Sequence, residues 1–516
     1  MKERSQPVAR TAFVITIMAA IGSVLTFVRE AVIAHIFGVG AVTDAYAVAA
    51  RVVMTAGMLV AVYMSFTFIP TYLRAYEARG SKGALGVANN SLGISLAINV
   101  FIMIVLLLAA PLVLTLTAFD AEQMLLALTA TYIVLLQLPI LAFIHFFNGY
   151  LAARKSFFGP NFAIIPMKVI FIVVCFIAGT QSGVVGLSVA ALLGTIVQCL
   201  VLFFWLSKEK YRYQFSMRFN TPEIRRDVVV LMPTLAAALL YDLHTWVAVI
   251  IATHLGEGNA AAIGFASRLP GFVQALIIVP IAGMVYSYMS EYAAKNDVEK
   301  MISILWKTVR TILFIVVPIV VIAMPSSFDI VRIVYQRGEF TPEATALTSS
   351  ALVWHMPGLL GYTVYTFVAR LYYSRQDTKT PMFCWIIVVP INIVLSIGLS
   401  SIMGIGGLAL ASSIGISLAT LLLLLFLRHK MGPLGFGQTA VDIAKMVVAA
   451  IPCAAATLGA GYLLSGQNVL IRFGGSALAG IIAYLIASYL LKEMVLREFV
   501  SFASGHIDTV TTRRKG

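Results

Sequence analysis

Arg51 and Arg268 constrain the chemistry of this 516-residue chain most, because each interrupts a long apolar stretch. Each also follows a Gly-x-Gly turn by about ten residues, at Gly38/Gly40 and at Gly256/Gly258. If these stretches cross a membrane, a central cation costs several kcal/mol unless it faces water or a partner. The two arginines therefore predict a polar cavity that receives an anionic ligand.

Further charged residues lie in the same stretches. Arg29 precedes the first Gly-x-Gly turn, and Asp44 lies seven residues before Arg51, so Asp44 and Arg51 share one helix face. Internal salt bridges that fix helix register, such as Arg29 with Asp44, are the alternative to a binding role. Near the ends of the stretches, side chains are expected to reach the interface instead: Glu30, His35, His254 and Arg370. Cations outnumber anions in these stretches, which favours the cavity.

Asp242 is a carboxylate in mid-stretch, close to His244. Such groups bind Na⁺ or relay protons in transporters, so Asp242 is a candidate for ion coupling. A structural pairing with an arginine is an equally good interpretation.

Enzyme chemistry and metal binding have no support in the chain. No phosphate-binding loop, nucleophile motif or metal-ligand spacing is present. The four cysteines all fall inside apolar stretches and are expected to pack as small hydrophobes; they are Cys175, Cys199, Cys384 and Cys453. We therefore predict no enzyme, no metal and no cofactor other than a coupling Na⁺ or proton.

The elements that must position these residues are membrane helices. The chain is 60% hydrophobic and only 11% charged, whereas soluble domains are about a quarter charged. Apolar stretches of about 20 residues predict an all-α polytopic protein of about fourteen spans. They begin near Thr11, Thr43, Gly86, Glu122, Phe157, Val184, Glu223, Asn259, Met301, Pro342, Thr380, Gly404, Ile443 and Phe473.

The loop charges predict the orientation. Alternate loops are rich in Lys and Arg, which marks the cytoplasmic side and places both termini there. This bias explains the net charge of +14 without a nucleic-acid partner. The cytoplasmic set includes Lys2, Arg4, Arg10, Arg74, Arg79, Lys82, Arg154, Lys155, Lys208, Lys210, Arg212, Arg218, Arg225, Arg226, Arg513, Arg514 and Lys515.

An internal repeat is visible at a constant offset of 221 residues. Eight identities support it, including Pro160 with Pro381 and Gly183 with Gly404. Parallel repeats of this kind are related by an axis along the membrane normal, with the substrate path between them. We predict an N-terminal six-helix lobe (1–220), a C-terminal six-helix lobe (221–437) and two additional helices with a tail (438–516).

Three strings resemble the MurJ/MviN lipid II flippases, a family of the multidrug/oligosaccharidyl-lipid/polysaccharide exporter superfamily. The first runs from Val28-Arg29-Glu30-Ala31 through Gly38 and Gly40 to Thr43-Asp44-Ala45. The others are Tyr335-Gln336-Arg337-Gly338-Glu339-Phe340-Thr341 and the segment from Tyr373 to Pro381. The resemblance covers essentially the whole chain, including the two additional C-terminal helices.

This resemblance implies a flippase of the bacterial cytoplasmic membrane. It would move the undecaprenyl-pyrophosphate-linked peptidoglycan precursor, lipid II, from the inner to the outer leaflet by alternating access. Its partners would be that polyprenyl-linked saccharide, membrane lipids and cell-wall synthesis proteins. The family's cavity residues match Arg29, Asp44 and Arg268, and Arg51 stands where a basic residue is tolerated.

The chain departs from the family pattern at four positions. The family's additional polar residues fall on Ser23, Gly57, Met58 and Val62. These departures leave open a flippase for another polyprenyl-linked saccharide, from exopolysaccharide, capsule or teichoic-acid synthesis. A cation-coupled drug exporter and a scaffold for cell-wall enzymes are the remaining alternatives.

Overall fold

The computed structural model describes residues 8–209, 211, 213–432 and 435–503, which form helices joined by turns, with no strand in that part of the chain. Side chains are described except at 8–16, 230, 237, 438 and 499–503. Several basic residues used to predict the orientation lie outside this description: Lys2, Arg4, the side chain of Arg10, Lys210, Arg212, Arg513, Arg514 and Lys515.

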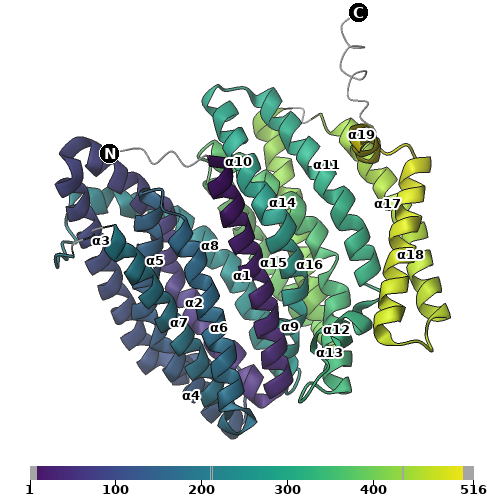
Figure 1. Cartoon of the computed structure of the whole chain (residues 1–516), viewed down its shortest axis with the longest axis horizontal. Coiled ribbons are helices and arrows are strands. Elements are labelled where there is room, and N and C mark those ends of the chain that lie inside the picture. The colour runs from purple at the N-terminus through teal and green to yellow at the C-terminus, as the bar shows by residue number, and fades with distance from the viewer. Residues whose placement is uncertain (1–7, 210, 212, 433–434, 504–516) are drawn as a thin grey trace, which may run out of the picture. The chain divides into compact units, whose positions relative to one another are not determined.

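The helices of the first half precede residue 210 (Figure 1). They are α1 (Val8–Phe37), α2 (Ala41–Tyr63), η1 (Met64–Phe68), α3 (Ile69–Leu114), α4 (Ala121–Leu135), α5 (Gln137–Ala153), α6 (Phe158–Ala178), η2 (Thr180–Ser182) and α7 (Gly183–Lys208).

The remaining helices follow an irregular connector. They are α8 (Pro222–His254), α9 (Asn259–Val273), η3 (Gln274–Ile278), α10 (Val279–Ala294), α11 (Val298–Ala323), α12 (Ser327–Tyr335), α13 (Pro342–His355), α14 (Gly358–Ser374), α15 (Lys379–Met403), α16 (Ile405–Met431), α17 (Phe436–Leu463), α18 (Val469–Leu490) and α19 (Met494–Ala503).

Twelve stretches of the described helices are long and apolar enough to cross a membrane. One of them, Ala41–Leu114, has 74 residues and turns at Gly80, where φ is 66°. Since about 20 residues suffice for one crossing, this stretch is long enough for two. The helices α13 and α14 are separated at Pro357, and each alone is too short to count. The all-α polytopic prediction is confirmed, and these two cases account for the difference between twelve and about fourteen.

The repeat at offset 221 is visible in the local structure. The bounds of α5 and α14 differ by 221 residues at both ends. Residues Lys155 and Gln376 both have positive φ, 59° and 62°, and so do Gly183 and Gly404, 51° and 57°. Unusual backbone angles at matching positions show that the repeat is structural. The lobe boundaries at 220 and 437 stay a prediction.

Two compact units divide the chain. The first contains 8–268, Tyr335–Leu347 and Trp385–Leu408, and the second contains Leu269–Val334, Thr348–Cys384 and 409–503. Within the first, α6 packs along α7 and α1, and α2 packs against α4. A Cβ on Gly194 of α7 would lie 2.9 Å from the Met167 carbonyl oxygen of α6. Lipid provides no hydrophobic drive between helices, so small residues that permit such contact stabilise the bundle.

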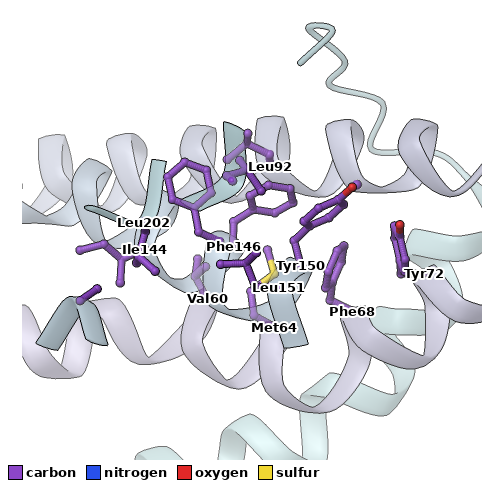
Figure 2. Packing of buried hydrophobic residues seen from close by; sticks show 14 of the residues in the cluster. Val60, Met64, Phe68, Tyr72, Leu92, Ile144, Phe146, Tyr150, Leu151 and Leu202 are labelled. Carbon is purple, nitrogen blue, oxygen red and sulfur yellow. The ribbon is translucent and has the colours of Figure 1, made fainter. Parts of the chain in front are cut away.

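An aromatic cluster fills the interior of the first unit (Figure 2). Phe68, Tyr72, Phe146 and Tyr150 are almost fully buried, with Met64 and Leu202 around them. The rings of Tyr72 and Tyr150 meet edge to face at 5.5 Å. This packing fixes α2, α5 and α7 against α3. Arg51, Gln137 and Thr195 lie on α2, α5 and α7 and are positioned by it.

Ion pairs fasten the C-terminal helices within the second unit. Arg310 of α11 donates to Asp442 of α17 at 2.7 Å, and the Asp442 side chain is 1% exposed. Arg472 of α18 pairs with Asp329 of α12. The two additional helices are therefore joined to their unit by polar contacts as well as by apolar packing.

Candidate functional site

A cavity of ≈360 Å³ lies in the first unit, and three arginines open into it. They are Arg29 of α1, Arg51 of α2 and Arg268 of α9. Glu30 is the one carboxylate among the residues that line it. Neutral polar groups of the lining are Thr43, Tyr46, Gln137, Thr195, Gln198 and Ser267. The structure thus brings the three sequence-predicted arginines to one cavity.

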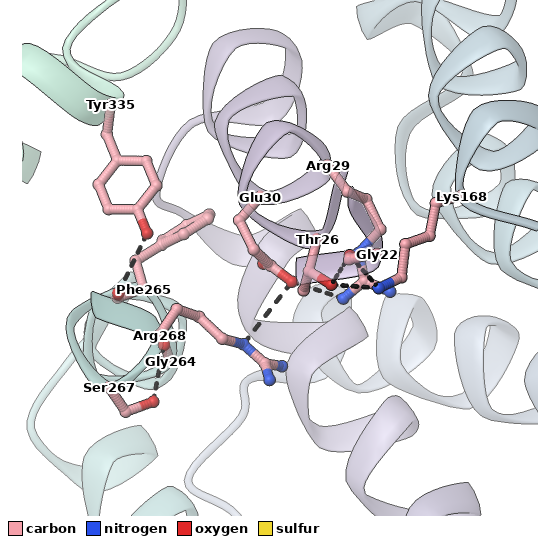
Figure 3. A network of polar contacts seen from close by, with 10 residues as sticks. All are labelled: Gly22, Thr26, Arg29, Glu30, Lys168, Gly264, Phe265, Ser267, Arg268 and Tyr335. Carbon is pink, nitrogen blue, oxygen red and sulfur yellow. Dashed lines mark hydrogen bonds and ion pairs between the residues drawn. The ribbon is translucent and has the colours of Figure 1, made fainter. Parts of the chain in front are cut away.

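Glu30 connects two of these arginines (Figure 3). Its Oε1 lies 2.5 Å from Nη2 of Arg29 and 3.6 Å from Nε of Arg268. The Glu30 side chain is 8% exposed, whereas that of Arg268 is 48% exposed. One carboxylate shared between two guanidinium groups leaves an excess of positive charge facing the cavity.

Arg29 is held from a second side by α6. Its guanidinium carbon lies 5.1 Å from the centre of the Phe171 ring, a cation–π contact. Beside it, the Lys168 ammonium donates to the Gly22 carbonyl oxygen at 2.7 Å and to the Thr26 hydroxyl of α1. Lys168 therefore adds a second cation close to Arg29 without a carboxylate of its own.

Arg51 has a different partner. Its Nη1 lies 3.1 Å from Oδ1 of Asp242 on α8. The Thr55 hydroxyl donates to the other oxygen of Asp242 and accepts a hydrogen bond from the Trp246 indole at 2.7 Å. Asp242 therefore contacts an arginine and a hydroxyl, and it does not line the cavity. Of its two predicted roles, this geometry matches the structural pairing.

Asp44 of α2 is buried beside the N-terminus of α9. Its two carboxylate oxygens accept from the backbone N–H groups of Gly258 and Ala261, each at 2.6 Å. A carboxylate at a helix N-terminus pairs with unsatisfied N–H groups and with the helix dipole. Among the described ion pairs Asp44 has none, so the alternative pairing of Arg29 with Asp44 is absent there; Arg29 pairs with Glu30.

Glu257, in the turn before α9, makes the corresponding contact with the N-terminus of α2. It accepts from the backbone N–H of Ala41, the first residue of α2, at 3.0 Å. Thus α2 caps α9 through Asp44, and the turn before α9 caps α2 through Glu257. The two Gly-x-Gly turns meet closely here, since a Cβ on Gly258 would lie 2.7 Å from Val39.

The motif that begins at Tyr335 joins this cluster of helix ends. The Glu339 N–H donates to the carbonyl oxygen of His35 at 3.0 Å, and the Tyr335 hydroxyl donates to that of Phe265 at 3.3 Å. Gly338 has φ of 59°, and a Cβ there would lie 2.3 Å from the His35 oxygen. Only glycine fits this approach, which explains its place in the motif.

Glu30 is the site residue that sequence reasoning missed. Its place near the end of a predicted span suggests that it reaches the interface, but the structure buries it to 6% exposure between two arginines. The available signal was that Glu30 is the only acidic residue of the first span and lies beside Arg29.

The positions that depart from the family pattern lie away from the cavity lining. Met58 and Val62 pack with Leu231 and Leu235 of α8, and Gly57 lies against Leu141. The Ser23 hydroxyl donates to the carbonyl oxygen of Ala19 in its own helix. No cluster of three or more His, Cys, Asp or Glu residues that could hold a metal occurs in the described part of the chain.

Comparisons with known proteins agree on one family. The family model described as "Lipid II flippase MurJ" matches residues 33–473. A "Probable lipid II flippase MurJ" of Treponema pallidum is 22% identical over 493 residues, which cover 92% of this chain and 93% of that protein. Another of the same description, from Vibrio cholerae, is 24% identical over 520 residues, with coverage of 95% and 97%.

A solved structure shares the fold. "Lipid II flippase MurJ, inward closed conformation" matches with a TM-score of 0.79 at 23% identity, covering 95% of this chain and 100% of that one. At this identity the likeness shows the fold alone, a polytopic bundle of membrane helices.

Proposed function

The chain belongs to the MurJ family of lipid II flippases, and from this premise we propose that it moves lipid II from the inner to the outer leaflet through the cavity of Arg29, Arg51 and Arg268. The chain is a multi-pass bacterial membrane protein and a transporter, not an enzyme. We further propose that both termini face the cytoplasm and that cell-wall synthesis proteins receive the product outside.

The excess of arginine in the cavity is the observation that carries the proposal. A diphosphate loses its hydration in hydrocarbon and needs donors that replace it. Guanidinium groups supply parallel, charge-assisted N–H bonds to phosphate oxygens. Glu30 satisfies only part of the donors of Arg29 and Arg268, and Nε of Arg29 is buried without a hydrogen-bond partner among the described residues. A bound diphosphate would complete this set.

The neutral polar residues of the cavity suit the sugar part of the headgroup. Gln137 and Gln198 offer amide groups, and the Thr195 hydroxyl donates to Gln137 at 3.0 Å. The polyprenyl tail remains in lipid throughout, so the cavity needs to hold only the headgroup.

Alternating access requires one end of the cavity to open while the other closes. The helix ends joined by Asp44, Glu257 and the Tyr335 motif form a hydrogen-bonded closure on one side of the cavity. In the orientation that the loop charges predict, this is the outer side. Release of the headgroup outward would require these bonds to break.

A flippase for another polyprenyl-linked saccharide is the second candidate. The observation that favours it is the apolar packing of Met58 and Val62, where the family carries polar residues. A cation-coupled drug exporter fits less well, since three arginines and one glutamate line the cavity.

Alanine substitution of each cavity arginine tests the proposal. We expect Arg29→Ala, Arg51→Ala and Arg268→Ala to reduce lipid II flipping per molecule in the membrane at least tenfold. Membrane abundance should stay within about twofold of the wild type for Arg29→Ala and Arg268→Ala, whereas Arg51→Ala leaves Asp242 unpaired and should lower it. Arg→Lys variants should keep part of the activity, because an ammonium cannot form the two parallel bonds of a guanidinium. Flipping is scored as lipid II exposure on the outer leaflet in cells depleted of their own flippase.

Lys295→Ala is the matched control, because this exposed cation forms an ion pair with Glu291, four residues earlier, and does not line the cavity. Wild-type flipping by all three arginine variants would contradict the cavity assignment. Rescue of a capsule or teichoic-acid flippase mutant, without rescue of lipid II flipping, would favour the second candidate.

A further inference from the structure

A second polar hollow, of ≈390 Å³, lies where the connector after α7 runs along α3. It shares no lining residue with the arginine cavity. Arg79, Asn89 and Asn90 of α3 line one side, and Gln214, Arg218 and Glu223 line the other. These residues lie in segments that the loop charges assign to the cytoplasmic side.

Asn90 builds the hollow by fixing the connector. Its Oδ1 accepts the N–H of Arg218 at 2.6 Å, and its Nδ2 donates to the carbonyl oxygen of the same residue at 3.0 Å. The connector approaches α3 so closely that a Cβ on Gly93 would lie 2.1 Å from the Ser216 carbonyl oxygen. The hollow is therefore a formed feature of the first unit, because side chains and backbone hold both walls.

Two sets of donors in the hollow lack a partner among the described residues. Asn89 is 4% exposed, and its Oδ1 accepts from the Tyr211 hydroxyl, but its Nδ2 donates to nothing there. Arg218 bonds to Asn90 through its backbone, and its guanidinium has no hydrogen-bond or ion-pair partner in the described part of the chain. The Asn89 amide and the Arg218 guanidinium both line the hollow, so a ligand with acceptor oxygens can take their hydrogen bonds.

The carboxylates of the hollow are already occupied. Glu223 pairs with Arg79, and Asp227 accepts from the hydroxyls of Thr71 and Tyr63. Asp227 keeps its negative charge, because hydroxyl donors do not neutralise it, so the lining holds two carboxylates and two cations. Arg218 is the lining cation that forms no ion pair among the described residues, and its guanidinium can bind an anion.

Exposed apolar side chains place the hollow at the membrane boundary. Phe215, Met217 and Phe219 of the connector are 75%, 44% and 54% exposed. Large apolar side chains beside basic residues are typical of segments that lie in the headgroup region of a bilayer. The acceptor oxygens within reach at that depth are those of phosphorylated lipid headgroups.

We propose that this hollow binds a phosphorylated lipid headgroup through Asn89 and Arg218. If the proposed function holds, the occupant is the diphosphate headgroup of the transported lipid before it reaches the arginine cavity. Binding itself does not depend on transport, because its donors are separate from Arg29, Arg51 and Arg268.

The test measures binding of inorganic diphosphate to the full-length chain in neutral phosphatidylcholine nanodiscs. An Arg268→Ala background weakens the competing cavity, and Arg218→Ala or Asn89→Asp is added to it. Asp retains the acceptor for Tyr211 while removing both free donors. We expect each addition to weaken diphosphate binding at least tenfold.

Arg225→Ala is the matched control, since Arg225 donates to Asn220 and does not line the hollow. It removes the same charge at the same end of α8 and should leave binding within twofold. Unchanged binding in both test variants overturns the proposal. If Asn89→Asp does not fold, Arg218→Ala alone decides, because Arg218 is an exposed residue.

Competing lipids identify the source of the headgroup. Displacement of diphosphate by undecaprenyl diphosphate, but not by phosphatidylglycerol, supports the transported lipid as the occupant. Displacement by both supports a phospholipid-binding hollow. Flipping by the wild type is measured separately, so that a chain that binds diphosphate here without flipping lipid II contradicts the proposed function and leaves this inference standing.

Discussion

At the scale of single residues, three arginines line the cavity beside a single carboxylate, Glu30. Arg29 and Arg268 share Glu30, whereas Arg51 pairs with Asp242, which lies outside the lining. Arg51 has a carboxylate partner to itself, so a bound anion stabilises it less than it stabilises Arg29 and Arg268. We expect Arg29 and Arg268 to contribute most to binding a diphosphate.

The contacts of Asp242 favour one of its two predicted roles, the structural pairing with an arginine. A carboxylate with an arginine nitrogen at 3.1 Å is a poor Na⁺ site, because the cation would have to displace the guanidinium. We expect Asp242→Asn to lower membrane abundance, since removal of one member of a buried pair leaves an unpaired charge, at a cost of up to about 3–5 kcal/mol. The double variant Arg51→Ala/Asp242→Asn should recover part of that abundance, as coupled residues do in a double-mutant cycle.

Transport with and without Na⁺, and across a range of external pH, distinguishes the other role of Asp242. If Asp242→Asn removes a Na⁺ or pH dependence that Arg51→Ala retains, the residue is an ion-coupling site and not a structural partner.

The arginines could be predicted from the sequence, but their partners could not. A cation in an apolar stretch is costly wherever the helix faces, so its presence alone predicts a cavity. The choice between Glu30, Asp44 and Asp242 as partner depends on which helices meet, and spacing along one chain does not determine that. Asp44 shares a face of α2 with Arg51. Among the described residues its carboxylate nevertheless binds no arginine and instead caps the N-terminus of α9.

At the scale of elements, the reciprocal caps predict how one side of the cavity opens. Loss of a helix cap costs about 0.5–2 kcal/mol. We expect Asp44→Ala to shift the protein toward the state in which the ends of α2 and α9 separate. A Val39→Cys thiol, which the contact with Gly258 shields, should then react several times faster with an impermeant maleimide.

The labelling is done with the four native cysteines replaced by alanine. Ala121→Cys serves as the reference, because Ala121 is exposed at the start of α4 and should react equally in both proteins. Equal reactivity of Val39→Cys with and without Asp44→Ala would show that the cap does not restrain this end.

The turns after α5 and after α14 occupy matching places in the two repeats. Each forms an ion pair, but the acidic and basic partners are reversed between them. After α5, Arg154 pairs with Glu209 at 3.3 Å; after α14, Asp377 pairs with Lys430 at 2.6 Å. Glu209 and Lys430 are themselves 221 residues apart. The repeat thus preserves the contact between the turn and the end of the following helix pair, while the residue types differ. Identities alone therefore understate how far the repeat extends.

The pair at Asp377 predicts a pH dependence of stability. Burial alone would raise the pKa of Asp377, but hydrogen bonds from Lys430 and Thr380 outweigh it and hold that pKa below its ordinary value. A carboxylate with a depressed pKa stabilises the fold above its unfolded-state pKa, and this is lost as the pH falls through the folded-state pKa. For a partly exposed pair, with side chains 47% (Lys430) and 23% (Asp377) exposed, the contribution is about 0.2–1 kcal/mol.

We therefore expect Asp377→Asn to lower the thermal unfolding midpoint slightly at neutral pH. The difference from the wild type should disappear in acid, once the native carboxylate is protonated as well. Glu122→Gln, at an exposed position of α4, is the control and should not show this convergence. A gap that persists at acid pH would assign the effect to packing.

At the scale of the whole molecule, we propose that the membrane potential drives the transport cycle through the charge of the cavity. One elementary charge that crosses the membrane is worth about 2.3 kcal/mol per 100 mV. An empty cavity with excess arginine carries positive charge, so an inside-negative potential favours its inward-facing state. A bound diphosphate neutralises that charge and removes the bias, which lets the loaded form turn outward. The potential would then drive the return of the empty protein.

Collapse of the membrane potential with an ionophore, at maintained ion gradients, tests this mechanism. We expect lipid II exposure on the outer leaflet to fall, because the empty carrier no longer returns efficiently. Asp242→Asn should retain this sensitivity, since the arginines carry the charge, whereas Arg29→Ala/Arg268→Ala should lose it in whatever transport remains. Unchanged flipping in the wild type after collapse of the potential would exclude an electrical reset, and would direct attention to an ion gradient acting at Asp242.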